Sequence, residues 1–181
     1  MGVYISILRG INVSGQKLIK MTDLVKHCEA LGLKNVKTYI QSGNVIFQSP
    51  DSAPEKISLK IAKKIKKEYG FDVPVMVKSA KDLKQILNNN PFIERGENTN
   101  QLYVTFLSDV PRRELVNNID PKRFLPEEFT WDKNVIYFFS PNGYGNAKMN
   151  NNFFENKLKV EATTRNWKTV TKLYEFAEQA V

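Results

Sequence analysis

The sequence predicts an α+β protein made of two split βαβ units, each with the order βαββαβ and each followed by an extra helix. Short strands are indicated by alternating apolar residues, and helices by apolar residues three and four positions apart. This order of segments occurs twice along the 181 residues. The composition is typical of a globular protein, since 41% of the residues are hydrophobic and 25% are charged.

Residues 1–90 are expected to form the first unit. Val3–Leu8 alternates between two faces, as a strand does. Gly43 suits a hairpin turn, which often needs positive φ, and Ser79 and Asp82 have the spacing of a capping box. In chain order we expect a strand at 3–8, a helix at 21–31, strands at 36–40 and 44–48, a helix at 54–69, a strand at 73–78 and a helix through residues 83–87.

A polar stretch at residues 91–100 is expected to link this unit to a second one at 101–181. Residues 3–8 match residues 102–107 conservatively at every position, and residues 44–47 match residues 134–137, so we expect an internal duplication. In chain order we expect a strand at 102–107, a helix at 111–119, strands at 128–131 and 134–139, a helix at 149–158, a strand at 160–163 and a terminal helix with Trp167, Val170, Leu173, Tyr174 and Ala177 on one stripe.

The charge balance favours anionic partners. Lys and Arg number 27 against 19 Asp and Glu, which gives a formal net charge of +8 at pH 7. Cys28 is the only cysteine, which excludes an intramolecular disulfide and suits a reducing compartment. The first residues lack a signal-peptide pattern, and no apolar run approaches the roughly 18 residues of a transmembrane helix. We therefore expect a cytoplasmic protein with no membrane partner.

Three sequence blocks resemble those of a known family. LRGINV at residues 8–13, TYIQSGNVIF at 38–47 and ATTRNWKTVTKL at 162–173 are similar to the hallmark blocks of the bacterial domain-of-unknown-function family 1697. The resemblance covers nearly the whole chain. It implies a bacterial cytosolic protein with two ferredoxin-like halves, and it implies no activity, substrate or catalytic residue.

Patterns that indicate catalysis or metal binding are scarce. His27 is the only histidine, and Cys28 points about 100° away from it on the same helix, so the two cannot act as nucleophile and base together. We expect Cys28 to be buried and unreactive, and we expect no metal and no cofactor. Gly10 and Gly15 have the glycine spacing of a P-loop, but the lysine and the hydroxyl residue that should follow are missing. Whether the chain is an enzyme stays open.

The best candidate site is one edge of the first sheet. In a split βαβ unit the first and third strands are antiparallel neighbours, so loops 9–20 and 41–44 should lie together. Loop 9–20 also leads into a helix N-terminus, which favours an anion. We expect this edge to bind a phosphate-bearing ligand, either a nucleotide or a nucleic acid. Its candidate residues are Arg9, Gly10, Asn12, Lys17, Lys20, Ser42, Gly43, Asn44 and, from the C-terminal block, Arg165.

Several alternatives remain open at this point. The glycines and asparagines of the edge can be turn and capping residues with no ligand. The same edge can serve a metal-independent small-molecule enzyme, and open sheet faces can bind a protein partner or dimerise. Thr164 or Asn166 can be the N-cap of the last helix, in which case Arg165 stands at a helix N-terminus and either meets the anion or forms a salt bridge between the halves.

The helix at 54–69 carries many lysines opposite its isoleucines, which is either a nucleic-acid patch or a solvated face. Tyr4 and Tyr103 lie on the first strand of each unit, where an RNA-recognition fold places aromatics that stack on bases. The third strand lacks that motif, so we expect both tyrosines to pack internally or between the halves. The lysines are Lys56, Lys60, Lys63, Lys64, Lys66 and Lys67.

Overall fold

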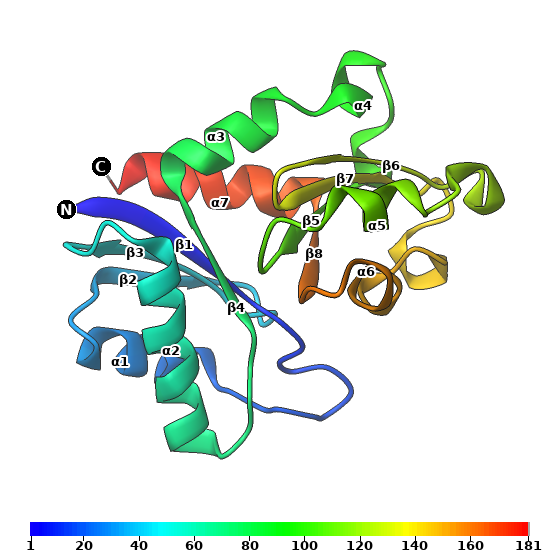
Figure 1. The fold of residues 1–181 in the computed structure, drawn as a ribbon. Coiled ribbons are helices and arrows are strands. Elements are labelled where there is room, and N and C mark those ends of the chain that lie inside the picture. The colour runs from blue at the N-terminus through cyan, green and yellow to red at the C-terminus, as the bar shows by residue number, and fades with distance from the viewer. Residues whose placement is uncertain (181) are drawn as a thin grey trace. The chain divides into compact units, whose positions relative to one another are not determined.

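The structure, a computed structural model, describes residues 1–180 and contains two four-stranded antiparallel sheets with helices (Figure 1). Packing divides the described chain into two units. Unit 1 contains Met1–Gln85 together with the residues from Lys172 onward, and unit 2 contains Ile86–Thr171. Within the described residues, no helix combines the length and the apolar character that a membrane span requires.

The sheet of unit 1 has the strand order β2-β3-β1-β4, and all neighbouring strands are antiparallel. This order places β1 and β3 side by side at the centre, as the sequence predicts. The expected capping box is present, because Asp82 N donates to Ser79 Oγ at 3.1 Å and Ser79 N donates to Asp82 Oδ2 at 3.0 Å. The elements are β1 (Gly2–Leu8), α1 (Met21–Ala30), β2 (Lys34–Tyr39), β3 (Asn44–Ser49), α2 (Pro54–Tyr69), β4 (Val75–Ser79) and α3 (Ala80–Asn88).

The sheet of unit 2 has the corresponding order β6-β7-β5-β8 and is also antiparallel. The stretch at 91–100 carries α4 and η1, and the end of α7 packs with unit 1. The elements are α4 (Pro91–Glu94), η1 (Thr99–Gln101), β5 (Leu102–Leu107), α5 (Arg113–Asn117), η2 (Pro121–Phe124), β6 (Glu128–Asp132), β7 (Val135–Phe139), η3 (Tyr144–Asn146), α6 (Asn151–Leu158), β8 (Ala162–Asn166) and α7 (Trp167–Gln179).

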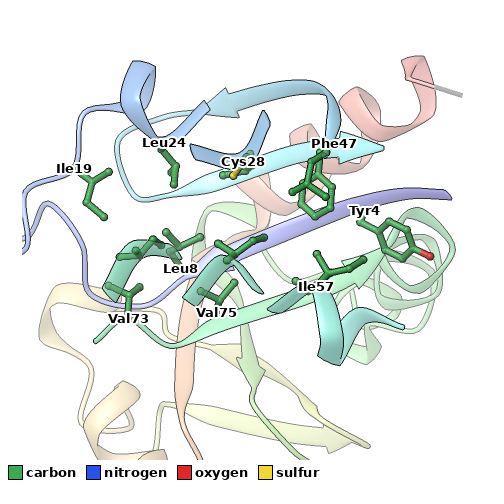
Figure 2. Packing of buried hydrophobic residues seen from close by; sticks show 14 of the residues in the cluster. Tyr4, Leu8, Ile19, Leu24, Cys28, Phe47, Ile57, Val73 and Val75 are labelled. Atoms are coloured by element: carbon green, nitrogen blue, oxygen red, sulfur yellow. The ribbon is translucent and has the colours of Figure 1, made fainter. Parts of the chain in front are cut away.

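One face of the first sheet forms a hydrophobic core with α1 and α2. Figure 2 shows Leu24 and Cys28 of α1 and Ile57 of α2 in one cluster with the sheet residues Tyr4, Leu8 and Phe47. The rings of Tyr4 and Phe47 have centroids 6.2 Å apart. Cys28 is 1% exposed, and burial raises the pKa of its thiol to about 12. Its expected burial is therefore confirmed, and at neutral pH the thiol is protonated and a weak nucleophile.

The other face of the first sheet is also covered. Ile5 and Ile46 point to this face and are 0% and 1% exposed. The ring of Tyr39 lies 5.5 Å from that of Phe176 in α7, and Gln48 Nε2 donates to the Ala180 carbonyl at 2.5 Å. The C-terminal residues therefore pack on this face of unit 1. These contacts give no support to the alternative in which open sheet faces bind a partner.

Strand pairing in the two sheets shows which residues of the two units correspond, and it corrects the correspondence expected from the sequence. Tyr4 pairs with Phe47 in the first sheet, and Tyr103 pairs with Phe138 in the second. Phe47 therefore corresponds to Phe138, so the match of residues 44–47 with 134–137 is out of register by one residue. These central strands are apolar on both faces, so hydrophobicity alone does not say which face each residue takes.

Candidate functional site

Loops 9–20 and 41–44 of unit 1 lie together, as expected from the antiparallel pairing of β1 with β3. Leu8 N donates to Gly43 O at 2.9 Å. The Asn12 amide joins the loops, because its Nδ2 donates to Gln41 O at 2.8 Å and to Ile19 O at 3.0 Å, while its Oδ1 accepts from Ile19 N at 2.8 Å. Asn12 therefore pins the start of the first loop both to its own end and to the second loop.

Loop 41–44 has its own structural constraints. Gly43 has a φ of +83°, and a Cβ there would stand 2.7 Å from Ile11 Cδ1, so no side chain fits without movement. Asn44 is fully buried, and its Nδ2 donates to Tyr39 O at 3.0 Å and to Ser42 Oγ at 3.1 Å. Gly43 and Asn44 thus shape the loop, and Ser42 contributes to it. For these residues, turn and packing roles account for the residue type without a ligand.

The basic residues of the edge come from loop 9–20. Arg9 is half-buried, and its backbone N–H donates to Pro74 O at 2.9 Å. Gly10 has a φ of +70° and open space where a Cβ would stand. Lys17 Nζ donates to the main-chain carbonyl of Asp72 at 2.7 Å, and Lys20 is exposed. The fold therefore brings eight of the nine candidate residues to one edge of unit 1, although several are used in protein contacts.

Helix α1 begins at this edge without a side-chain cap. Lys20 is its N-cap residue and makes no capping hydrogen bond through its side chain. The first N–H groups of a helix have no partner inside the helix, so they are open to water or to an anion. Asp23 in the first turn already supplies one negative charge near these groups.

Arg165 directly precedes the cap of the last helix, which is one of the two arrangements expected from the sequence. It lies in strand β8 of unit 2 and is 8% exposed. Its Nη1 donates to Thr163 Oγ1 and to Thr164 O, both at 3.0 Å. The helix cap is Asn166, whose Oδ1 accepts from Thr169 N at 2.8 Å. The strand continues up to that cap because β-branched threonines pair well with β5. Arg165 therefore belongs to unit 2. Its part in anion binding stays a prediction.

Sequence reasoning missed a buried cation in unit 1. Tyr4 pairs with Ser79, and Tyr103 pairs with Asn166, so Lys78 in β4 corresponds to Arg165 in β8. Both cations are 8% exposed, and both make further interactions. Burying a charge costs free energy unless the charge is paired or hydrogen-bonded. Each of these two cations therefore needs its protein partners for the strand to be stable. Aligning the two strands on the helix cap that follows each of them would have found Lys78.

The threonines of the C-terminal block belong to a hydrogen-bond network in unit 2. Thr164 Oγ1 lies 2.7 Å from Thr105 Oγ1, and it donates to Asn151 Oδ1 at 2.6 Å. The hydroxyl of Tyr144 donates to Thr164 Oγ1 at 3.2 Å and accepts from Asn151 N at 2.9 Å. Tyr103 packs internally as expected, with its ring 5.4 Å from that of Tyr144. These contacts join strands β5 and β8 to the start of α6.

Metal-ligating groups, the histidine and a pocket are further features whose position is compared with that of the candidate edge. No group of three or more His, Cys, Asp or Glu side chains in the part of the chain that the structure describes could hold a metal ion. His27 Nε2 lies 3.1 Å from the Tyr69 hydroxyl on the core side of α1. A pocket of about 220 Å³ lies at the opposite end of β3, where Lys60 pairs with Asp51 at 2.5 Å. None of the candidate residues lines it.

Comparisons with known proteins give a matching family and a similar solved structure. A family model described as "Protein of unknown function (DUF1697)" matches residues 1–137. A search of curated proteins finds no match. Among solved structures, the conserved bacterial protein SP0830 from Streptococcus pneumoniae is similar, with 24% sequence identity, a TM-score of 0.78, and coverage of 97% of this chain and 98% of that one. At this identity the likeness shows a shared fold.

Proposed function

The chain belongs to the DUF1697 family, and we propose that this member binds a phosphate-bearing ligand at the edge formed by loops 9–20 and 41–44 of unit 1. We also infer that each unit has ferredoxin-like topology, which the strand orders β2-β3-β1-β4 and β6-β7-β5-β8 support. A cytoplasmic location is part of the proposal, and the single free cysteine supports it.

The observation that carries the binding proposal is how Lys17 is held. Its ammonium donates to the main-chain carbonyl of Asp72 at 2.7 Å, which fixes the group without cancelling its charge. The Asp72 carboxylate pairs instead with Lys66 at 2.6 Å. Lys17 has no ion pair within the described residues, and two of its three N–H groups stay available. A positive charge is thus positioned in advance for an anion.

The backbone of loop 9–20 adds support. Asn12, Ser14 and Lys17 all have positive φ values, of 55°, 49° and 46°. Such conformations cost about 1–3 kcal/mol each outside glycine and are concentrated at functional sites. The Asn12 contacts hold the loop in this shape. Because the charges lie on a loop at the start of α1, we expect recognition of the phosphate group itself rather than of an enclosed apolar part of the ligand.

Calorimetric titration with pyrophosphate and ATP, at constant ionic strength, tests the proposal. Lys17→Gln removes the charge and leaves an amide donor one bond shorter than the ammonium, so we expect stability to change by less than about 1 kcal/mol and binding to weaken about tenfold, as for one lost charge-assisted hydrogen bond. Lys20→Gln should also weaken binding. The matched control is Lys26→Gln, an exposed position later on α1, which should bind like the unchanged protein.

The outcome against the proposal is equally clear. If the unchanged protein binds neither pyrophosphate nor ATP, the edge is a structural junction and the proposal fails. If Lys17→Gln and Lys26→Gln weaken binding equally, the effect comes from net charge and the edge is not the site. Arg9 is a poorer first target because it makes other contacts, so its replacement would change packing and charge together.

A further inference from the structure

Helix α2 has two opposite faces. Ile57, Ile61 and Ile65 face the core and are between 0% and 1% exposed. Four exposed lysines, Lys56, Lys60, Lys63 and Lys67, recur at positions i, i+4, i+7 and i+11 on the other side; we call them the basic stripe. With a rise of about 1.5 Å per residue the basic stripe is roughly 16 Å long.

Each of the two lysines beside the basic stripe has its own carboxylate partner, whereas the stripe has fewer carboxylate partners than its four lysines. Lys64 pairs with Glu68 at 2.7 Å, and Lys66 pairs with Asp72 at 2.6 Å. Within the stripe, Lys60 pairs with Asp51 at 2.5 Å. The hydrogen bond and the charge of Lys60 lower the pKa of the Asp51 carboxyl most, and the charge of Lys56 lowers it further. One carboxylate thus serves two lysines of the stripe.

Lys63 and Lys67 form no ion pair within the residues that the structure describes. The pKa of the Glu68 carboxyl is lowered chiefly by its partner Lys64 and further by the charge of Lys67, so Glu68 compensates Lys67 only in part. The face that holds the basic stripe therefore keeps an excess of positive charge. The whole chain also carries a formal net charge of +8, so its overall field has the same sign. Exposed lysines in a row, with fewer carboxylates than lysines beside them, attract a partner with negative charges in a row.

The residues around the basic stripe select among such partners. The stripe contains no aromatic side chain on which the bases of a single strand could stack. Leu59 is a large apolar side chain of α2 that is 59% exposed, whereas the isoleucines of the helix are buried in the core. The helix therefore has no apolar face to insert into a bilayer. A nucleic-acid duplex instead presents one phosphate charge per about 1.7 Å of its axis.

We propose that the basic stripe binds the sugar–phosphate backbone of a double-stranded nucleic acid without sequence preference. Lysines act as point charges toward phosphates, and phosphate contacts position a protein on a duplex without reading bases. This surface lies on α2 and shares none of the edge residues, so the inference goes beyond the proposed function. It stands or falls independently of binding at loops 9–20 and 41–44.

Fluorescence anisotropy with a labelled random-sequence duplex, repeated over a range of salt concentrations, tests the inference. The double variant Lys63→Gln, Lys67→Gln should weaken binding, and it should reduce the slope of log K against log salt by about 2, since each phosphate contact contributes about 0.9. The matched control is Lys64→Gln, Lys66→Gln, which removes the same charge from the same helix. We expect this control to change the slope by less than about half as much.

Each remaining outcome overturns the inference. If the two double variants lose binding and slope equally, the effect is one of net charge and not of the basic stripe. If the unchanged protein binds the duplex without salt dependence or not at all, no phosphate row is contacted. Tighter binding to a single strand, or to vesicles of anionic lipid at the same ionic strength, would assign the surface to another partner.

Circular dichroism is the control for folding, and it should show equal helix content in both double variants.

Discussion

At the scale of single residues, Ser6 and Thr105 occupy the same position in corresponding strands but have different surroundings. Thr105 faces Thr164 across the β5–β8 pair, and their hydroxyl oxygens lie 2.7 Å apart. Ser6 faces Val77 in the same position of the first sheet, and its buried hydroxyl has no hydrogen-bond partner within residues 1–180. One unit thus satisfies a buried hydroxyl that the other leaves unsatisfied.

This difference predicts opposite effects of two small substitutions. An unsatisfied buried hydroxyl costs about 1–3 kcal/mol, so Ser6→Ala should raise the free energy of unfolding by about 1 kcal/mol. Thr105→Val keeps the volume but removes a partner of Thr164, so it should lower that free energy by about 1–3 kcal/mol. Urea denaturation measures both. A clear loss of stability in Ser6→Ala would mean that the serine hydroxyl has an acceptor and would contradict the comparison of the strands.

The pairing of the first and third strands predicts that loops 9–20 and 41–44 lie together, but residue type does not predict the role of each member. Asn12, Gly43 and Asn44 are candidate site residues by their place in these loops, yet each has hydrogen bonds or close packing that fix the loops. The sequence cannot distinguish an amide that clamps two loops from one that binds a ligand, because both need the same donors and acceptors. The partner of Lys17 is a main-chain carbonyl, which leaves no mark in the sequence.

At the scale of elements, periodicity predicted the long and apolar segments best. Pro54–Tyr69 and Leu102–Leu107 have the predicted bounds, because their apolar spacing is regular and a turn or cap borders them. Strand β8 extends to Asn166, beyond the predicted end at Thr163. The predicted end falls there because Thr164 and Asn166 are polar enough to indicate a helix cap. Only pairing with β5, which lies far away in the sequence, makes these residues a strand.

Two adjacent glutamates at the start of β6 allow a test of how this element is fixed. Glu127 is 6% exposed and accepts from Lys148 N at 2.8 Å and from Met149 N at 2.9 Å. Glu128 has a side chain that is 38% exposed and pairs with Arg95 at 2.9 Å. The first carboxylate therefore holds the segment that leads into α6, while the second forms an ion pair near solvent.

Replacing each glutamate with its amide should separate these roles. Glu127→Gln puts an NH₂ group against a backbone N–H and loses charge-assisted bonds, so the free energy of unfolding should fall by about 1–3 kcal/mol. Glu128→Gln should cost less, because the Arg95–Glu128 pair, although bidentate, joins two partly exposed side chains that water can solvate once the pair is lost. Thermal and urea unfolding of both variants provide the comparison. Equal losses would show that burial of Glu127 does not determine its contribution.

At the scale of the whole molecule, unit 1 is built from two segments that are not consecutive in the sequence. The residues from Lys172 onward pack with unit 1, although they follow unit 2 in the sequence. Leu173 and Ala177 are fully buried there, and Phe176 contacts Tyr39. The sequence predicted an apolar stripe on the last helix, but periodicity shows only that a face is buried and not which sheet covers it. A polar stretch in the sequence therefore carries no information on which unit the terminal helix joins.

The last prediction is that residues 1–90 do not form a stable domain without the C-terminal helix. A fragment that ends there lacks Leu173 and Phe176, and burying each such side chain contributes about 1.5–3 kcal/mol out of a total stability of about 5–15 kcal/mol. We expect the fragment to unfold with low cooperativity, and a peptide of residues 167–181 added in trans should restore a cooperative transition in circular dichroism. The same peptide with Leu173→Asp is the control and should have no effect. If the fragment alone unfolds cooperatively and the peptide does not raise its midpoint, the terminal helix is dispensable for unit 1, and the domain boundary expected from the sequence is the correct one.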